Sequence, residues 1–202
     1  MRVAAILVGS YLLGSIPVGL ILVRAWKGID IRQYGSGNIG ATNVLRTAGK
    51  GPAAVVFLAD VSKGLLPVCI ARLISPHNDW LAMGGGMAAI LGHATSIFLR
   101  FRGGKAVATS LGVIIGLTPP VAGIAFGVWL VLVALTKIVS VGSIAATISI
   151  LPLMFAFHCS AAVKLFGAVA SAFVLIKHKS NISRLIQRKE PRIGQKVSLP
   201  EG

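Results

Sequence analysis

Two glycine-rich stretches carry the residues best suited to hold an anion. The first, GSGNIGATN at residues 35–43, spaces Gly35, Gly37 and Gly40 so that successive backbone N–H groups can turn toward one point. Arg46 follows on an expected helical turn, where its guanidinium can bind a phosphate through two parallel hydrogen bonds. Neutral hydrogen-bond donors complete the set: Ser36, Asn38, Thr42 and Asn43. The stretch predicts a phosphate site.

The same letters, GSGNIG, match the glycine spacing of a dinucleotide-binding loop. That interpretation requires a buried strand before the loop and a helix after it, within a βαβ unit. The preceding residues, GIDIRQY, are polar and basic and contain no apolar run of strand length. The context therefore excludes a nicotinamide or flavin site, and we expect no cofactor.

The second stretch, FRGGKAVAT at residues 101–109, places Arg102 and Lys105 around Gly103 and Gly104 just before an expected helix. Backbone donors, a helix N-terminus and two cations again favour an anion. It is not a P-loop, because the upstream glycine is absent and Ala106 follows the lysine. Two such loops predict two phosphoryl groups, or one held from both sides.

Polar side chains inside or at the ends of apolar runs are further candidates. Asp60 and Lys63 are three residues apart and can pair on one helical face. Ionisable residues are costly inside a bilayer, so the pair either serves function or fixes helix packing. Candidates at helix ends are His93 and Ser96, Ser143 in the SVGS turn, and His178 and Asn181 on one face near the C-terminus. His93 fits either a structural hydrogen bond or a general base.

Several catalytic patterns are missing from the sequence. No H-x-x-x-x-D follows any histidine, no G-x-S-x-G elbow occurs, and no His, Cys or carboxylate cluster has metal-ligand spacing. Five acidic residues leave little scope for paired carboxylates. An enzyme built on this chain would depend on an already activated substrate and on electrostatic stabilisation.

The composition defines the elements that must position these residues. The chain has 202 residues, of which 55% are hydrophobic and 12% charged, whereas soluble domains contain about 25% charged residues. Its mean hydropathy is +0.85 and its formal charge is +15. A membrane protein with anionic lipid or substrate partners is indicated, and nucleic acid is not an expected partner.

Apolar runs predict an all-α polytopic protein with seven transmembrane helices, at residues 3–23, 52–74, 80–99, 106–118, 119–136, 138–157 and 161–176. The fourth is short, so a re-entrant or tilted segment competes with a true span. With the N-terminus outside, 16 of the 20 lysines and arginines fall on the cytoplasmic side, together with both glycine-rich loops. We expect one membrane domain, residues 1–202, with a basic cytoplasmic tail from about residue 187. The oligomeric state is open, with a monomer preferred.

Four ordered motifs carry a resemblance to a known family. They are GSGNIGATN with its following arginine, DVSKG, GHATSIFLRFRGGKAVAT and HKSNISRL. Together they resemble the bacterial acyl-phosphate:glycerol-3-phosphate acyltransferases, the PlsY family, over residues 12 to about 191. One departure is Ala106, where the family usually has glycine.

The resemblance implies a seven-helix enzyme of the bacterial inner membrane with its active site on the cytoplasmic side. It would transfer a fatty acyl group from acyl phosphate to the sn-1 hydroxyl of glycerol-3-phosphate, giving lysophosphatidic acid and phosphate. The first glycine-rich loop would receive the acyl phosphate, and the proton would leave to a substrate phosphate oxygen or to a histidine. The positions that match the family's substrate-binding and catalytic residues are Ser36, Arg46, Lys105, Ser143, His178 and Asn181.

Two other functions remain open from the residues alone. A carrier for phosphorylated solutes also suits seven helices and anion-binding loops, although carriers usually place their polar groups at the bilayer midplane. A non-catalytic scaffold with a basic face explains the tail but leaves the two glycine-rich loops without a purpose.

Overall fold

The computed structural model describes residues 1–195, and all regular structure in that range is helical. Lys196, counted above among the tail cations, lies outside the described residues. The helices, in chain order, are α1 (Arg2–Ser15), α2 (Val18–Lys27), η1 (Ile31–Gln33), α3 (Ala41–Thr47), α4 (Lys50–Ile74), α5 (Asp79–Ala94), η2 (Ile97–Leu99), α6 (Val107–Leu117), α7 (Pro119–Thr136), α8 (Val139–Ala156), α9 (Ala161–Lys177) and α10 (Lys179–Ile186).

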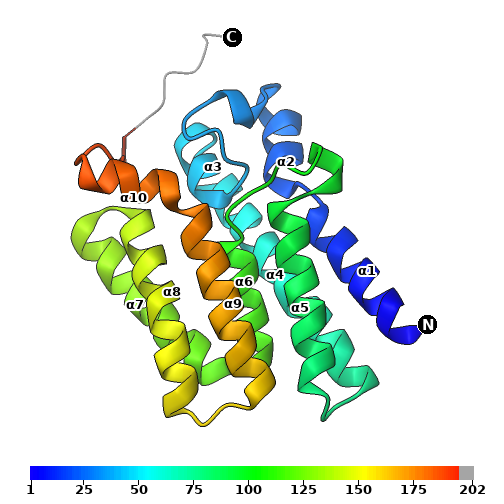
Figure 1. Ribbon diagram of the computed structural model, residues 1–202. Coiled ribbons are helices and arrows are strands. Elements are labelled where there is room, and N and C mark those ends of the chain that lie inside the picture. The colour runs from blue at the N-terminus through cyan, green and yellow to red at the C-terminus, as the bar shows by residue number, and fades with distance from the viewer. Residues whose placement is uncertain (196–202) are drawn as a thin grey trace.

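The long helices run up and down beside one another, and their polar connections gather at one end of the bundle (Figure 1). α2, α3, α10 and the loop before α6 lie at that end, while the N-terminus lies at the other. The two glycine-rich stretches, far apart in the sequence, are thereby brought to the same end of the molecule. Which side of the membrane this end faces stays a prediction.

Five helical segments are long and apolar enough to cross a membrane: Arg2–Lys27, Lys50–Ile74, Asp79–Leu99, Pro119–Thr136 and Val139–Ala156. A sixth forms if α9 and α10, which meet at a bend of 57°, count as one span. α6 has 11 residues and is about 16 Å long at 1.5 Å per residue, against a hydrocarbon core of about 30 Å. The structure thus supports five or six of the seven predicted spans, and a crossing by α6 stays a prediction.

The first span is broken where the sequence predicted one continuous helix. α1 ends at Ser15 and α2 begins at Val18, because Pro17 has no N–H to continue the helical ladder. The carbonyl oxygens of Ser15 and Ile16, at this break, accept side-chain hydrogen bonds. Ser96 Oγ donates to Ser15 O at 2.5 Å, and Lys63 Nζ donates to Ile16 O.

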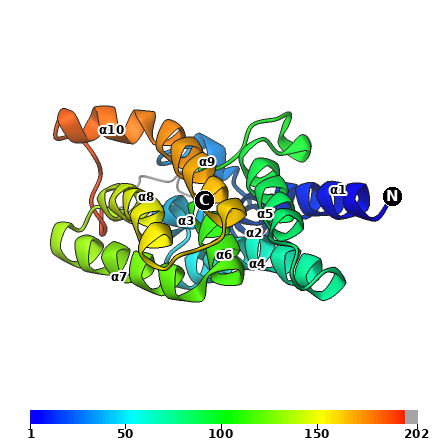
Figure 2. The same cartoon turned by 60° about the horizontal axis from the view of Figure 1, so that its bottom comes forward.

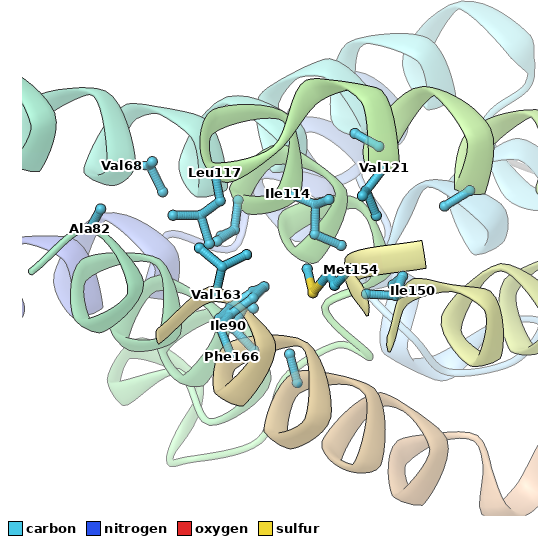
Figure 3. Close-up of a cluster of buried hydrophobic side chains, with 14 of the residues drawn as sticks. Val68, Ala82, Ile90, Ile114, Leu117, Val121, Ile150, Met154, Val163 and Phe166 are labelled. Carbon is cyan, nitrogen blue, oxygen red and sulfur yellow. The ribbon is translucent and has the colours of Figure 1, made fainter. Parts of the chain in front are cut away.

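The core sits between α4, α5, α6, α7, α8 and α9. Buried side chains from these helices point toward one another in Figure 3, including Val68, Ile90, Ile114, Met154 and Phe166. This cluster fixes the ends of the helices that carry the polar side chains.

α4 and α6 approach closely enough for glycine to be required on both. A Cβ at Gly64 would lie 2.0 Å from Thr109 O, and one at Gly112 would lie 1.9 Å from Val61 O. Backbone-to-backbone contact of this kind is common where membrane helices pack through small residues.

The α4–α6 contact gives a stability prediction. Gly112→Ala should lower the free energy of unfolding by about 1–3 kcal/mol, because the two backbones must separate. Gly127→Ala in α7 is the control, since its Cβ would meet nothing within 4 Å. The control should be neutral or slightly stabilising, as alanine is the better helix former. Thermal unfolding in detergent measures both, and equal losses would contradict the close packing.

Candidate active site

A polar cavity of about 130 Å³ opens where the connections gather. Eleven of the predicted site residues line it: Ser36, Asn38, Gly40, Thr42, Asn43, Arg46, His93, Lys105, Ser143, His178 and Asn181. Seven do not: Gly35, Gly37, Lys63, Ser96, Arg102, Gly103 and Gly104. The cavity therefore assembles residues from both glycine-rich loops and from three other motifs.

The first glycine-rich loop is held by the side chain of Asn43, which is 1% exposed. Its Oδ1 accepts from Ser36 N at 2.9 Å, and its Nδ2 donates to Tyr34 O at 3.0 Å and to Asn38 O at 2.9 Å. Gly35 and Gly37 adopt left-handed backbone angles, with φ of 61° and 67°, that favour glycine. Asn43, predicted as a ligand donor, thus spends its hydrogen bonds on the loop.

Arg46 enters the cavity from α3, and its Nη2 donates to Pro191 O at 3.3 Å. Lys105 enters from the second loop, and its Nζ donates to Asn181 Oδ1. Two cations from distant parts of the chain therefore converge on one pocket, and the cavity can attract an anion through both.

His178 and Ser143 line the cavity opposite the first loop. His178 Nδ1 lies 2.8 Å from Val174 O, and since a carbonyl only accepts, Nδ1 must carry a proton. Nε2 of a neutral ring is then free to accept a hydrogen bond. Ser143 Oγ donates to Val139 O at 3.0 Å and accepts from Trp129 Nε1 at 3.3 Å.

Glu190 is a cavity residue that the sequence did not reveal. Ser140 Oγ and Asn181 Nδ2 donate to its Oε1 at 2.8 and 2.5 Å, and Arg184 Nε donates to its Oε2 at 2.6 Å. Although burial alone raises the pKa of this carboxyl, these donors hold it below its usual range. The one signal in the sequence was the position of this acid between the cations Lys189 and Arg192.

Residues 187–195 belong to the predicted basic tail, and most of them are exposed, but Glu190 and Pro191 contact the site. Figure 2 shows the segment after α10 crossing toward α7 and α8. Ile193 N donates to Lys137 O at 2.7 Å, beyond the contacts of Glu190 and Pro191. The segment thereby closes one wall of the cavity.

A second, apolar cavity of about 60 Å³ adjoins the polar one. The two share five lining residues, Phe57, Val107, Ala108, Trp129 and Ser143. From there the apolar cavity extends between α6, α8 and α9 as far as Ile114, Ile150 and Gly167. The site therefore joins a compartment for charge to a compartment for hydrocarbon.

Comparison with known proteins decides the family. A family model described as glycerol-3-phosphate acyltransferase matches residues 4–188. The chain belongs to the glycerol-3-phosphate acyltransferase family. The acyltransferase of Synechococcus elongatus is 47% identical over 98% of both chains, and that of Gloeobacter violaceus is 46% identical over 92% of both.

Two solved structures share the fold of this acyltransferase. Both are crystal structures of PlsY, an integral membrane glycerol 3-phosphate acyltransferase. The glycerol 3-phosphate form is 39% identical over 96% of both chains with a TM-score of 0.92, and the lysophosphatidic acid form is 38% identical with a TM-score of 0.89. The present chain is thus an integral membrane enzyme that acylates glycerol-3-phosphate, as the resemblance implied, and the carrier and the scaffold are set aside.

The backbone conformation of Ala106 explains why glycine would be favoured at this position. It adopts a left-handed conformation, φ 59° and ψ 19°, and is 1% exposed. A Cβ in that conformation costs about 1–2 kcal/mol, which glycine avoids.

Ala106→Gly should therefore raise the free energy of unfolding by about 1 kcal/mol. The matched control is Ala108→Gly, the same change two residues into α6, which should lower stability by about 0.5–1 kcal/mol. Thermal unfolding in detergent compares the pair, and a loss of stability in both variants would reject strain at residue 106.

Lys105 gives a pH prediction. Burial lowers the pKa of its ammonium to about 8; Glu190 counteracts this, while Arg184 and Arg46 add to it. Lys105 is then charged below pH 8 and loses its charge above it, so kcat/KM should fall about tenfold per pH unit on the alkaline side. Lys105→Arg keeps its charge and should remove this limb. An unchanged limb in that variant would assign it to another group.

Proposed function

We propose that the enzyme transfers a fatty acyl group from acyl phosphate to the sn-1 hydroxyl of glycerol-3-phosphate, giving lysophosphatidic acid and inorganic phosphate. The observation that carries this proposal is the junction of the two cavities. One is lined by Arg46 and Lys105, and the other, which shares Phe57 and Trp129 with it, is lined mainly by apolar side chains. A molecule with a charged head and a hydrocarbon chain fits both at once.

The neighbouring PlsY structures support the choice of acceptor and product, since one is a glycerol 3-phosphate form and the other a lysophosphatidic acid form. The choice of acyl phosphate as donor rests on the sequence motifs and on the chemistry of the site. Within residues 1–195, no group of three His, Cys, Asp or Glu side chains could hold a metal ion. A mixed anhydride is already activated, and this suits a site made of cations and backbone donors.

In the proposed reaction, the glycerol hydroxyl oxygen attacks the acyl carbonyl carbon and the bond from that carbon to the phosphate oxygen breaks. Lys105 neutralises the departing phosphate. Arg46 holds the phosphate of glycerol-3-phosphate, and Nε2 of His178 accepts a hydrogen bond from the hydroxyl, which orients it. Positioning of this kind lowers the barrier by several kcal/mol. The hydroxyl proton passes to an oxygen of the departing phosphate.

The remaining residues of the cavity have supporting roles in this proposal. Ser36 and the first glycine-rich loop receive the acyl phosphate, and Ser143 and Asn181 complete the hydrogen-bonding wall. We further propose that the chain is a monomer with a single domain and seven spans in the inner membrane. Its N-terminus lies outside, and its site faces the cytoplasm. This orientation rests on the excess of cations at the end of the bundle where the site lies.

Phosphate release tests the proposal directly. Purified enzyme with palmitoyl phosphate should release phosphate only when glycerol-3-phosphate is present. With palmitoyl-CoA as donor, whose leaving group is CoA, no lysophosphatidic acid should form. Lys105→Ala should lower the rate by about a hundredfold, the effect of removing one transition-state donor. Arg100→Ala is the matched control, because this exposed cation of the same loop lies outside the cavity and its loss should leave the rate unchanged. Formation of lysophosphatidic acid from palmitoyl-CoA and glycerol-3-phosphate would overturn the proposal that acyl phosphate is the donor.

A further inference from the structure

Three ionisable side chains are buried within the membrane helices beneath the second glycine-rich loop. Asp60, Lys63 and His93 are 2%, 4% and 5% exposed. The proposed reaction uses none of them. Charged groups at such places require partners, and the identity of those partners shows what the cluster holds in place.

Lys63 and Asp60 satisfy each other. Lys63 Nζ donates to Asp60 Oδ1 at 2.8 Å and also to Ile16 O, a carbonyl at the break before Pro17 that accepts from Val18 N as well. The pair therefore ties α4 to the broken first span and fixes the position of the carboxylate.

His93 lies between this carboxylate and the loop. Its Nδ1 is 3.6 Å from Asp60 Oδ1. On its other side, a Cβ added to Gly104 would lie 2.2 Å from His93 Nε2, so only glycine fits against the imidazole. Gly104 N also donates to His93 O at 3.1 Å. Nδ1 of the imidazole thus faces the carboxylate, and Nε2 lies against Gly104, the residue before Lys105.

We propose that His93, held by Asp60, is a positioning residue whose imidazole supports Gly104 and thereby sets where the adjacent Lys105 meets the anionic substrate. This role rests on the proposed function of Lys105. It differs from that of a general base, which would exchange a proton with the substrate. His93 lines the cavity, but it acts through the loop.

The neighbouring glycines provide a matched pair for the test. A Cβ at Gly104 would meet the imidazole, whereas a Cβ at Gly103 would lie 2.2 Å from the backbone oxygen of His93, which remains whatever the side chain. Neither glycine has a positive φ, so the cost of alanine at each position comes from its contact with His93 and not from its own backbone angles. Replacing the imidazole should therefore relieve Gly104→Ala and leave Gly103→Ala unrelieved.

A double-mutant cycle measures this coupling. His93→Ala and Gly104→Ala should each lower kcat/KM by about ten- to a hundredfold, as expected for a displaced catalytic group. The double variant should be no worse than His93→Ala alone. Gly103→Ala combined with His93→Ala should instead lose the product of the two single effects.

Three results would overturn the proposal. The first is that His93→Ala has only background activity. The second is that His93→Ala couples equally to Gly103→Ala and Gly104→Ala, and the third is that the effects of His93→Ala and Gly104→Ala on kcat/KM are independent. Thermal unfolding is recorded for each variant. If His93→Ala does not fold, the cycle uses His93→Asn, whose shorter side chain keeps a donor near Asp60 and stops short of Gly104. Failure of the parent enzyme to acylate glycerol-3-phosphate would reject the proposed function instead, since the cycle compares variants only with an active parent.

Discussion

A charge inside a membrane helix must find its partners within the protein, and the organisation of this molecule follows from that constraint. Lys63 and Asp60 neutralise each other, but an ammonium has three protons and a carboxylate several lone pairs. The remaining partners come from the break in the first span and from the edge of His93. Three helices are therefore held in register at one depth, directly below the loop that carries Lys105.

The position of the site follows from the chemistry of its substrates. A phosphate cannot be buried in hydrocarbon without great cost, and an acyl chain is not stable in water. The polar cavity lies at the end of the bundle among loops, and the apolar cavity continues between helices. Phe57 and Trp129 border both cavities; in the proposed function, the boundary between head and chain lies at these side chains.

Much of the fold could be predicted from the sequence, because runs of apolar residues of sufficient length have few alternatives to a membrane helix. The type and spacing of residues were less informative about the role of a polar side chain, because that role depends on the partner it meets in the folded chain. Asn43 has the side chain of a ligand donor but holds its own loop, and Ser96 bonds the break at Ser15. Glu190 could not be found, because its partners lie on two helices and only the folded chain brings them together.

Residues 188–193 follow every membrane helix that the structure describes, yet they supply Glu190 and the carbonyl that accepts a hydrogen bond from Arg46. Synthesis proceeds from the N-terminus, so all the helices can enter the bilayer before this wall exists. Insertion of the helices into the membrane and completion of the site are therefore separate events. A chain that ends just after α10 would have its membrane helices in place, but its cavity would lack Glu190 and the carbonyl of Pro191. The last segment therefore completes the site after the helices have assembled.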